Sequence, residues 1–276
     1  MSGNTISAIV SACGYVKKSF LGMLESLGAY AALIGEVCVS SFRKPPSWAL
    51  LREQLYNIGV MSLIVVTITG FSTGIILAAQ SFYQLRDKGF AGVTGIMVAK
   101  AMITELGPIL TALMVTGRVG SAMCAELGTM KVTEQIDALR TMAVNPNSYL
   151  ISPRFIAGFV MVPMLTIYSI LMGIFGGYLI STFYFGMPPS EYFNPMPLHI
   201  SLFDLFTGIV KALIFGILLV TICCYKGLQT KGGAAGVGNA TTQSVVISYI
   251  SILISDFLIT MALNSLHQAI MGDMFS

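Results

Sequence analysis

Charged side chains are scarce in this sequence: Asp, Glu, Lys and Arg make up only 10% of its 276 residues. Soluble domains carry about 25%, so the composition argues against a protein surrounded by water. The net charge of +3 is too small for a polyanionic partner, which excludes nucleic-acid binding. With 55% hydrophobic residues and a mean hydropathy of +0.82, the sequence predicts an integral membrane protein.

Groups that ligate metals or catalyse hydrolysis are equally scarce. The chain has two histidines, His199 and His267, with no His/Cys/Asp cluster near either, and an odd number of cysteines, five. Neither a metal site nor a disulfide framework is expected. The phosphate-binding loop is also missing, because Asn239 stands where that motif needs its lysine. We therefore expect no catalytic residue, no cofactor and no enzyme activity in this chain.

Five long stretches are apolar and nearly free of charge, and each can cross about 30 Å of hydrocarbon as a helix. In chain order these stretches are Ile58–Ala79, Gly95–Val119, Ser152–Phe185, Leu202–Tyr225 and Ser244–Met271. Gly107-Pro108 predicts a kink within the second of them. The predicted fold is an all-α integral membrane protein with five transmembrane helices.

Residues Phe20–Ser41 form a shorter apolar stretch with large side chains at helical spacing. Both of its ends are basic, Lys17-Lys18 and Arg43-Lys44, so a crossing would place one basic pair on the wrong side. We expect a helix that lies in the membrane interface.

Lys and Arg are distributed unequally between the two sides of the predicted spans. Eleven lie on the side of the N-terminus, whereas the other side holds only Arg86 and Lys88. Because basic residues are retained in the cytoplasm, the N-terminus is expected to be cytoplasmic and the C-terminus to lie on the opposite side. The glycine-rich stretch Lys226–Thr242 is then expected to be a cytoplasmic loop, and the proline-rich stretch Met187–Leu198 an external one.

Three charged residues lie near the middle of the predicted spans, where each costs about 2.5–3.5 kcal/mol on insertion scales. Lys211 and Asp256 are expected to form an intramembrane pair between the fourth and fifth spans. Glu105 has no obvious partner in the sequence, so it is a candidate for lining a polar path through the membrane. An alternative is that all three act as the relay of an ion-coupled secondary transporter.

The connection between the second and third spans, Arg118–Arg154, is long and contains a helical pattern. Ile136, Leu139 and Met142 supply its apolar positions, and charges of both signs occupy the remainder. A helix lying on the bilayer would favour a basic polar face. The mixed charge favours a helix on which a cytoplasmic protein docks.

Several short motifs occur in a specific order along the chain. They are Gln54-Leu-Tyr-Asn-Ile-Gly59, Thr104-Glu-Leu-Gly-Pro108, Gly117-Arg-Val-Gly-Ser121, Ala125-Glu-Leu-Gly128, Thr133-Glu-Gln135, Ile151-Ser-Pro-Arg154, Ala240-Thr-Thr242 and Asp256-Phe-Leu258. In this combination the sequence resembles the MlaE family of ABC-transporter permeases over roughly residues 50–272. The chain departs at Thr104, where some members carry Arg, so no basic role is expected there.

The resemblance implies a permease subunit that moves phospholipid between the inner and outer bacterial membranes. It implies a homodimer in the inner membrane, a cytoplasmic ATPase subunit that binds ATP and Mg, and a periplasmic MCE-domain protein. Residues 1–52 would form the cytoplasmic N-terminal region with an interfacial elbow helix. Residues 53–276 would form the five-span permease domain.

The resemblance also assigns residues to roles. The lipid path would include Leu77, Gln80, Glu105 and Leu106. The coupling helix would cover about 126–144, and its contacts with the ATPase would come from Glu126, Glu134, Ile136, Leu139, Arg140 and Met142.

Overall fold

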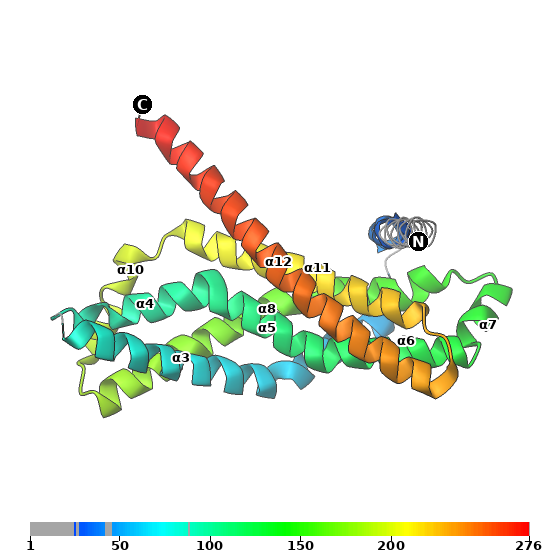
Figure 1. Cartoon of the computed structure of the whole chain (residues 1–276), viewed down its shortest axis with the longest axis horizontal. Helices are drawn as coiled ribbons and strands as arrows, with labels where there is room; N and C mark the ends of the chain where they lie inside the picture. The colour runs from blue at the N-terminus through cyan, green and yellow to red at the C-terminus, as the bar shows by residue number, and fades with distance from the viewer. Residues whose placement is uncertain (1–24, 26–27, 42–45, 88, 276) are drawn as a thin grey trace, which may run out of the picture.

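The computed structural model describes residues 25, 28–41, 46–87 and 89–275. Within these residues it contains helices and no strands, and five helical segments are long and apolar enough to cross a membrane. The segments are Trp48–Arg86, Ala91–Val132, Asn147–Tyr184, Leu202–Leu228 and Gly233–Ala269. Four of them lie side by side along the long axis, and the last crosses them obliquely (Figure 1). The predicted five-span, all-α fold is confirmed.

The first two spans are each built from several helical pieces. The first joins α2 (Trp48–Ile58), η1 (Val60–Ser62) and α3 (Leu63–Arg86). The second runs through η2 (Ala91–Val93), α4 (Thr94–Ala101), η3 (Met102–Leu106), α5 (Gly107–Val115), η4 (Thr116–Gly120) and α6 (Ser121–Val132).

Both η3 and η4 are π turns. The η3 turn comes directly before Gly107-Pro108, where a distortion is expected because Pro108 has no N–H to bond back along the helix. The second π turn, η4, was not predicted.

The third and fourth spans begin with recognisable start signals. The third comprises η5 (Asn147–Ile151), α8 (Ser152–Leu179) and η6 (Ile180–Tyr184), and Pro153 occupies the first turn of α8. Two short helices, α9 (Pro189–Phe193) and α10 (Met196–His199), lead to α11 (Leu202–Leu228). Ser201 and Asp204 form a reciprocal capping box at the start of α11.

The fifth span, α12 (Gly233–Phe275), begins eleven residues earlier than predicted. The glycine-rich stretch Lys226–Thr242, expected as a loop, is therefore mostly helix. The physical reason is packing against α6. A Cβ added at Gly128 would lie 2.9 Å from the Thr230 hydroxyl and 3.5 Å from Val237, so the missing side chain lets the two elements approach closely.

The predicted coupling helix is divided in two. Its first part is the end of α6, which stops at Val132, and its second is α7 (Gln135–Thr141). The prediction of one continuous helix is wrong at this point, because Glu134 adopts a left-handed conformation with φ of 61°. A left-handed residue reverses the local backbone direction and ends a right-handed helix.

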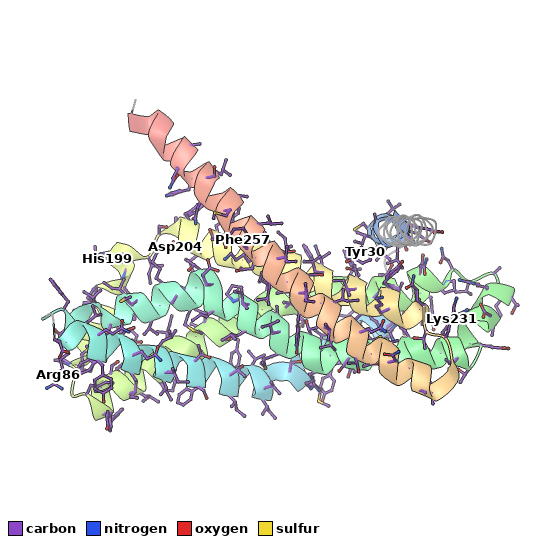
Figure 2. All side chains as sticks on the ribbon, in the orientation of Figure 1. Tyr30, Arg86, His199, Asp204, Lys231 and Phe257 are labelled. Atoms are coloured by element: carbon purple, nitrogen blue, oxygen red, sulfur yellow. The ribbon has the colours of Figure 1, made fainter. Side chains whose placement is uncertain are left out.

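The two ends of the bundle are distinct. Lys231 and Tyr30 lie toward the end that carries α7, whereas Arg86 and His199 lie toward the end that carries α9 and α10 (Figure 2). Rings stack at the α9–α10 end, including Phe82 on Phe185 with centroids 4.1 Å apart. At the α7 end the largest apolar cluster unites α2, α6, α7, α8 and α11.

A further helix, Gly28–Ser41, is seen end-on in Figure 1, so its axis runs across the bundle. It belongs to the stretch expected in the membrane interface; residues 20–24, 26 and 27 of that stretch lie outside the described part. Val37 is fully buried in the large apolar cluster, and the Tyr30 hydroxyl lies 2.6 Å from that of Thr221.

Candidate functional site

The three charges that the sequence places near the middle of the spans meet at one point between η3, α11 and α12. The Lys211 ammonium donates a hydrogen bond of 2.5 Å to Glu105 Oε2 and lies 3.0 Å from Asp256 Oδ1. The Lys211 side chain is fully buried, that of Asp256 is 14% exposed and that of Glu105 is 38% exposed. Opposite charges therefore offset one another where hydration is least available.

The structure brings Lys211 and Asp256 together, as the sequence predicts, and adds Glu105 to them. The expectation that Glu105 lacks a partner is wrong. Lys211 is 106 positions away, so spacing along one helix could not reveal the contact. The π turn at Met102–Leu106 also alters the direction in which Glu105 points, because a π turn holds more residues than an α-helical turn.

Thr260 completes the cluster and was missed by sequence reasoning. Its hydroxyl lies 2.8 Å from the Asp256 carbonyl oxygen and 3.4 Å from Glu105 Oε1. The signal that could have found it is its position one turn after Asp256 in α12. With two carboxylates around one ammonium, the cluster can lock η3, α11 and α12 together.

The four residues expected along a lipid path do not line one continuous surface. Leu77 and Leu106 pack against the same small apolar cluster of Ala78, Val98 and Met102. Gln80 is exposed, and Glu105 turns toward Lys211 instead. Within one copy of the chain, the apolar pair and the charged residue therefore face different neighbours.

The apolar residues expected to contact an ATPase differ in how far they are exposed. Ile136 is only 1% exposed and packs in the large apolar cluster, so it attaches α7 to the bundle and is not free to anchor a partner. Leu139 is partly buried, and it lines a hollow of about 240 Å³ together with Met142, which is 64% exposed. These two residues leave an apolar surface open on α7.

The polar members of this set hold the α6–α7 segment in place. The Glu126 carboxylate forms an ion pair with the Arg154 guanidinium, 2.9 Å away, and the Arg154 side chain is 4% exposed. Arg140 lies 3.3 Å from Asp137, and Glu134 forms the left-handed break. The segment is thus tied to the start of α8 and presents an exposed, mixed-charge face.

Comparison with known proteins decides the family. A family model described as Permease MlaE matches residues 51–262. The chain belongs to the MlaE permease family. Among its relatives, the intermembrane phospholipid transport system permease protein MlaE of Haemophilus influenzae is 34% identical over 258 residues, covering 91% of this chain and 97% of the relative.

Two other relatives come from a second bacterium and from a plant. A "Probable ABC transporter permease protein" of Rickettsia typhi is 39% identical over 253 residues, covering 91% of this chain and 97% of its own length. The chloroplastic protein TRIGALACTOSYLDIACYLGLYCEROL 1 of Arabidopsis thaliana is 33% identical over 228 residues, covering 83% of this chain and 65% of the plant protein.

Proposed function

We propose that this MlaE-family permease is the membrane subunit of an ATP-driven ABC transporter that moves phospholipid between the inner and outer membranes. The observation that carries the proposal is the family match over most of the membrane domain, together with the phospholipid transport named for the Haemophilus relative. The exposed apolar surface on α7 supports a separate ATPase subunit, which would bind ATP and Mg.

The proposed assembly is a homodimer in the bacterial inner membrane with a periplasmic MCE-domain partner. The N-terminus would be cytoplasmic, because Arg118, Lys131, Arg140 and Arg154 belong to the α7 end of the bundle and basic residues favour the cytoplasmic side. The C-terminus would lie on the periplasmic side, because α12 runs toward the α9–α10 end as it leaves the bundle (Figure 1).

A movement of α7 could be transmitted into the membrane through the second span. From α6 the second span continues through η4, α5 and η3 to Glu105 without leaving helical geometry. The π turns at η4 and η3 are points where the backbone ladder is already altered, and such turns are frequent at functional sites. ATP-driven motion would therefore reach both the charged cluster and the apolar cluster near Leu106.

A second candidate function is an ion-coupled secondary transporter. The observation that favours it is the contact of Glu105, Lys211 and Asp256, because two carboxylates near one ammonium can exchange a proton. It needs no cytoplasmic partner, whereas the exposed face of α7 is best explained by one. The two candidates differ in their energy source, which the following experiment separates.

The test uses Met142→Asp in the full chain, purified with any bound ATPase. We expect loss of the ATPase and of lipid-stimulated ATP hydrolysis, since interface hot spots commonly cost about 2 kcal/mol or more. The control is Leu198→Asp in α10, which is 85% exposed at the opposite end and should leave both unchanged. Lipid transport that follows a proton gradient and needs no ATP would overturn the proposal in favour of the second candidate.

A further inference from the structure

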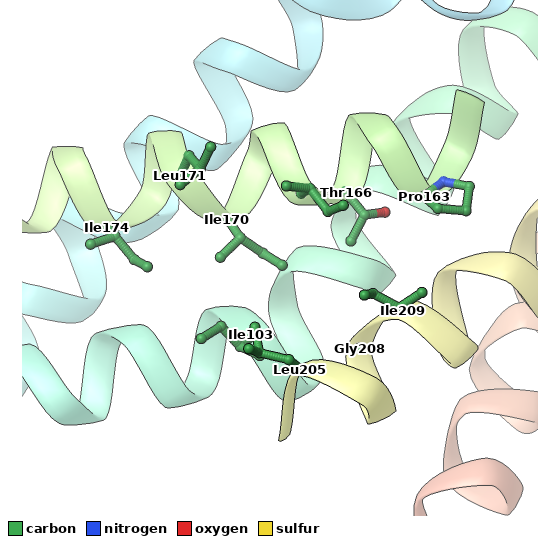
Figure 3. Close-up of a pocket in the computed structure, with 10 residues that line it drawn as sticks. Ile103, Pro163, Thr166, Ile170, Leu171, Ile174, Leu205, Gly208 and Ile209 are labelled. Carbon is green, nitrogen blue, oxygen red and sulfur yellow. The ribbon is translucent and has the colours of Figure 1, made fainter. Parts of the chain in front are cut away.

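An apolar groove runs along the outside of the bundle. None of its lining residues belongs to the charged cluster, and Ile170 is shared with the apolar cluster against which Leu77 and Leu106 pack. The groove lies between α8, α11 and η3, has a volume of about 290 Å³ and is lined almost wholly by carbon (Figure 3). Its one polar side chain, Thr166, donates its hydroxyl hydrogen to the Val162 carbonyl 2.9 Å away. The side chains of the groove therefore leave no hydrogen-bond donor free for water.

Close backbone packing shapes the floor of the groove. A Cβ on Gly208 would overlap the carbonyl oxygen of Ile103, so α11 and η3 touch there without side chains between them. The rim residues remain accessible: Leu171 is 57% exposed and Leu205 is 43% exposed. The groove thus opens sideways, toward the medium around the bundle.

One cation, Lys100, contacts Asp204, the residue before Leu205, which lines the groove. Lys100 precedes Ile103 by three positions, and its ammonium lies 3.9 Å from Asp204 Oδ2. The Lys100 side chain is 54% exposed and makes no hydrogen bond to any residue that the structure describes. Asp204 already caps α11 by accepting from the Ser201 N–H, so the ammonium keeps donors for another group.

The height of Lys100 matches a lipid headgroup. Lys100 and Arg118 lie 18 positions apart in one helical segment, which is at most about 27 Å at the α-helical rise of 1.5 Å per residue, because the π turns η3 and η4 shorten it. This approaches the roughly 30 Å thickness of the bilayer hydrocarbon. We place Arg118 at one interface; Lys100 then lies near the other, and the groove would extend from it toward the middle of the membrane.

We propose that the groove holds one acyl chain of a membrane phospholipid whose phosphate is bound by Lys100. A volume of about 290 Å³ is at the lower end of ligand pockets, which suits a single chain and excludes a whole lipid. Because Lys100 would repel a headgroup ammonium, the site favours phosphatidylglycerol over phosphatidylcholine. The proposal needs only a bilayer and does not depend on transport.

The test places a single tryptophan beside the groove and measures its quenching by lipids brominated in the acyl chain. Trp48, the one tryptophan of the chain, is first replaced in Trp48→Phe, and Leu171→Trp then becomes the reporter. The matched control reporter is Ile76→Trp in α3, which is 56% exposed and does not line the groove. Each protein is reconstituted with brominated phosphatidylglycerol or brominated phosphatidylcholine.

At position 171 we expect an apparent affinity about fivefold higher for the brominated phosphatidylglycerol, the size of effect for one lysine at a membrane surface. Lys100→Gln should abolish the preference, and Lys100→Arg should keep it, which separates charge from folding. At position 76 neither variant should change the ratio. Equal affinities at position 171, or a preference that survives Lys100→Gln, would overturn the proposal.

Discussion

Two polar regions join distant parts of this chain, and they differ in what surrounds them. The charged cluster of Glu105, Lys211 and Asp256 lies inside the spans, and its ammonium is fully buried. At the α7 end, an ion pair ties α6 to the start of the third span, hydrogen bonds from two asparagines tie the helix Gly28–Ser41 to it, and most of the residues involved are exposed. A polar contact should therefore contribute differently to stability in the two regions.

The comparison shows that the number of polar contacts is a poor measure of stability. Breaking a buried ion pair leaves a charge that water cannot reach, whereas water replaces the lost partner of an exposed one. Among these polar contacts, those of the charged cluster should consequently fix the helices most strongly. The α7 end should be easier to rearrange, as a surface that receives motion from a partner requires.

The largest effect is expected from Lys211→Met. This change leaves Glu105 and Asp256 facing each other without a cation, and breaking a buried pair typically costs about 3–5 kcal/mol. We expect a strongly lowered unfolding midpoint and poor yield of the reconstituted protein, measured by thermal unfolding in lipid nanodiscs.

The pairing itself is checked by adding changes at the acidic partners. Lys211→Met with Asp256→Asn should be milder than Lys211→Met alone, and the further change Glu105→Gln should restore more of the loss. Thr260→Val is the control, because it removes only one hydroxyl. If the double and triple variants are no more stable than Lys211→Met, the three charges do not stabilise one another.

Sequence alone predicted the spans well because apolar length and charge are local properties. The third span was expected to start at Ser152-Pro153; α8 does start there, although the π-helical η5 begins the span five residues earlier, at Asn147. The start of α12 at Gly233 escaped prediction, because glycine disfavours helices locally and packing against α6 outweighs that preference.

The site was predicted only in part for the same reason. Lys211 and Asp256 could be paired from their charges in neighbouring spans, whereas Glu105 and Thr260 join through contacts between segments distant in sequence. Ile136 is the opposite case. Its apolar spacing was correctly seen, but the sequence does not say whether such a face covers a partner or the bundle itself, and Ile136 covers the bundle.

A smaller effect is expected at the junction of α6 and α8, where one member of an ion pair is buried and the other is exposed. Arg154 is 4% exposed and Glu126 is 51% exposed. Glu126→Gln leaves a buried guanidinium without its carboxylate and should cost about 1–3 kcal/mol. Arg154→Met leaves a carboxylate that water can reach, so it should cost less. Thermal unfolding of both variants measures this order, and the reverse order would contradict the assigned burial.

A still smaller effect is expected where the helix Gly28–Ser41 meets the third span. The Glu36 carboxylate accepts hydrogen bonds from Asn145 at 2.9 Å and Asn147 at 2.8 Å. Glu36→Gln should cost about 0.5–1 kcal/mol and speed amide hydrogen exchange within Gly28–Ser41, with little change in the unfolding midpoint. Glu25→Gln, at another exposed position, is the control. Unchanged exchange would show that apolar contacts such as those of Val37 hold this helix.

The smallest effect is expected from Asp137→Asn in α7. Asp137 lies 3.0 Å from the Lys131 ammonium and 3.3 Å from the Arg140 guanidinium, and its own side chain is 48% exposed. Exposed pairs contribute about 0.2–1 kcal/mol, so stability should fall by less than that of Glu126→Gln. The difference should vanish at about 1 M salt, where the screening length is about 3 Å. Unfolding at low and high salt measures it. A loss that equals that of Glu126→Gln and survives high salt would mean that α7 is fixed as rigidly as the charged cluster, and the contrast between the two regions would then not hold.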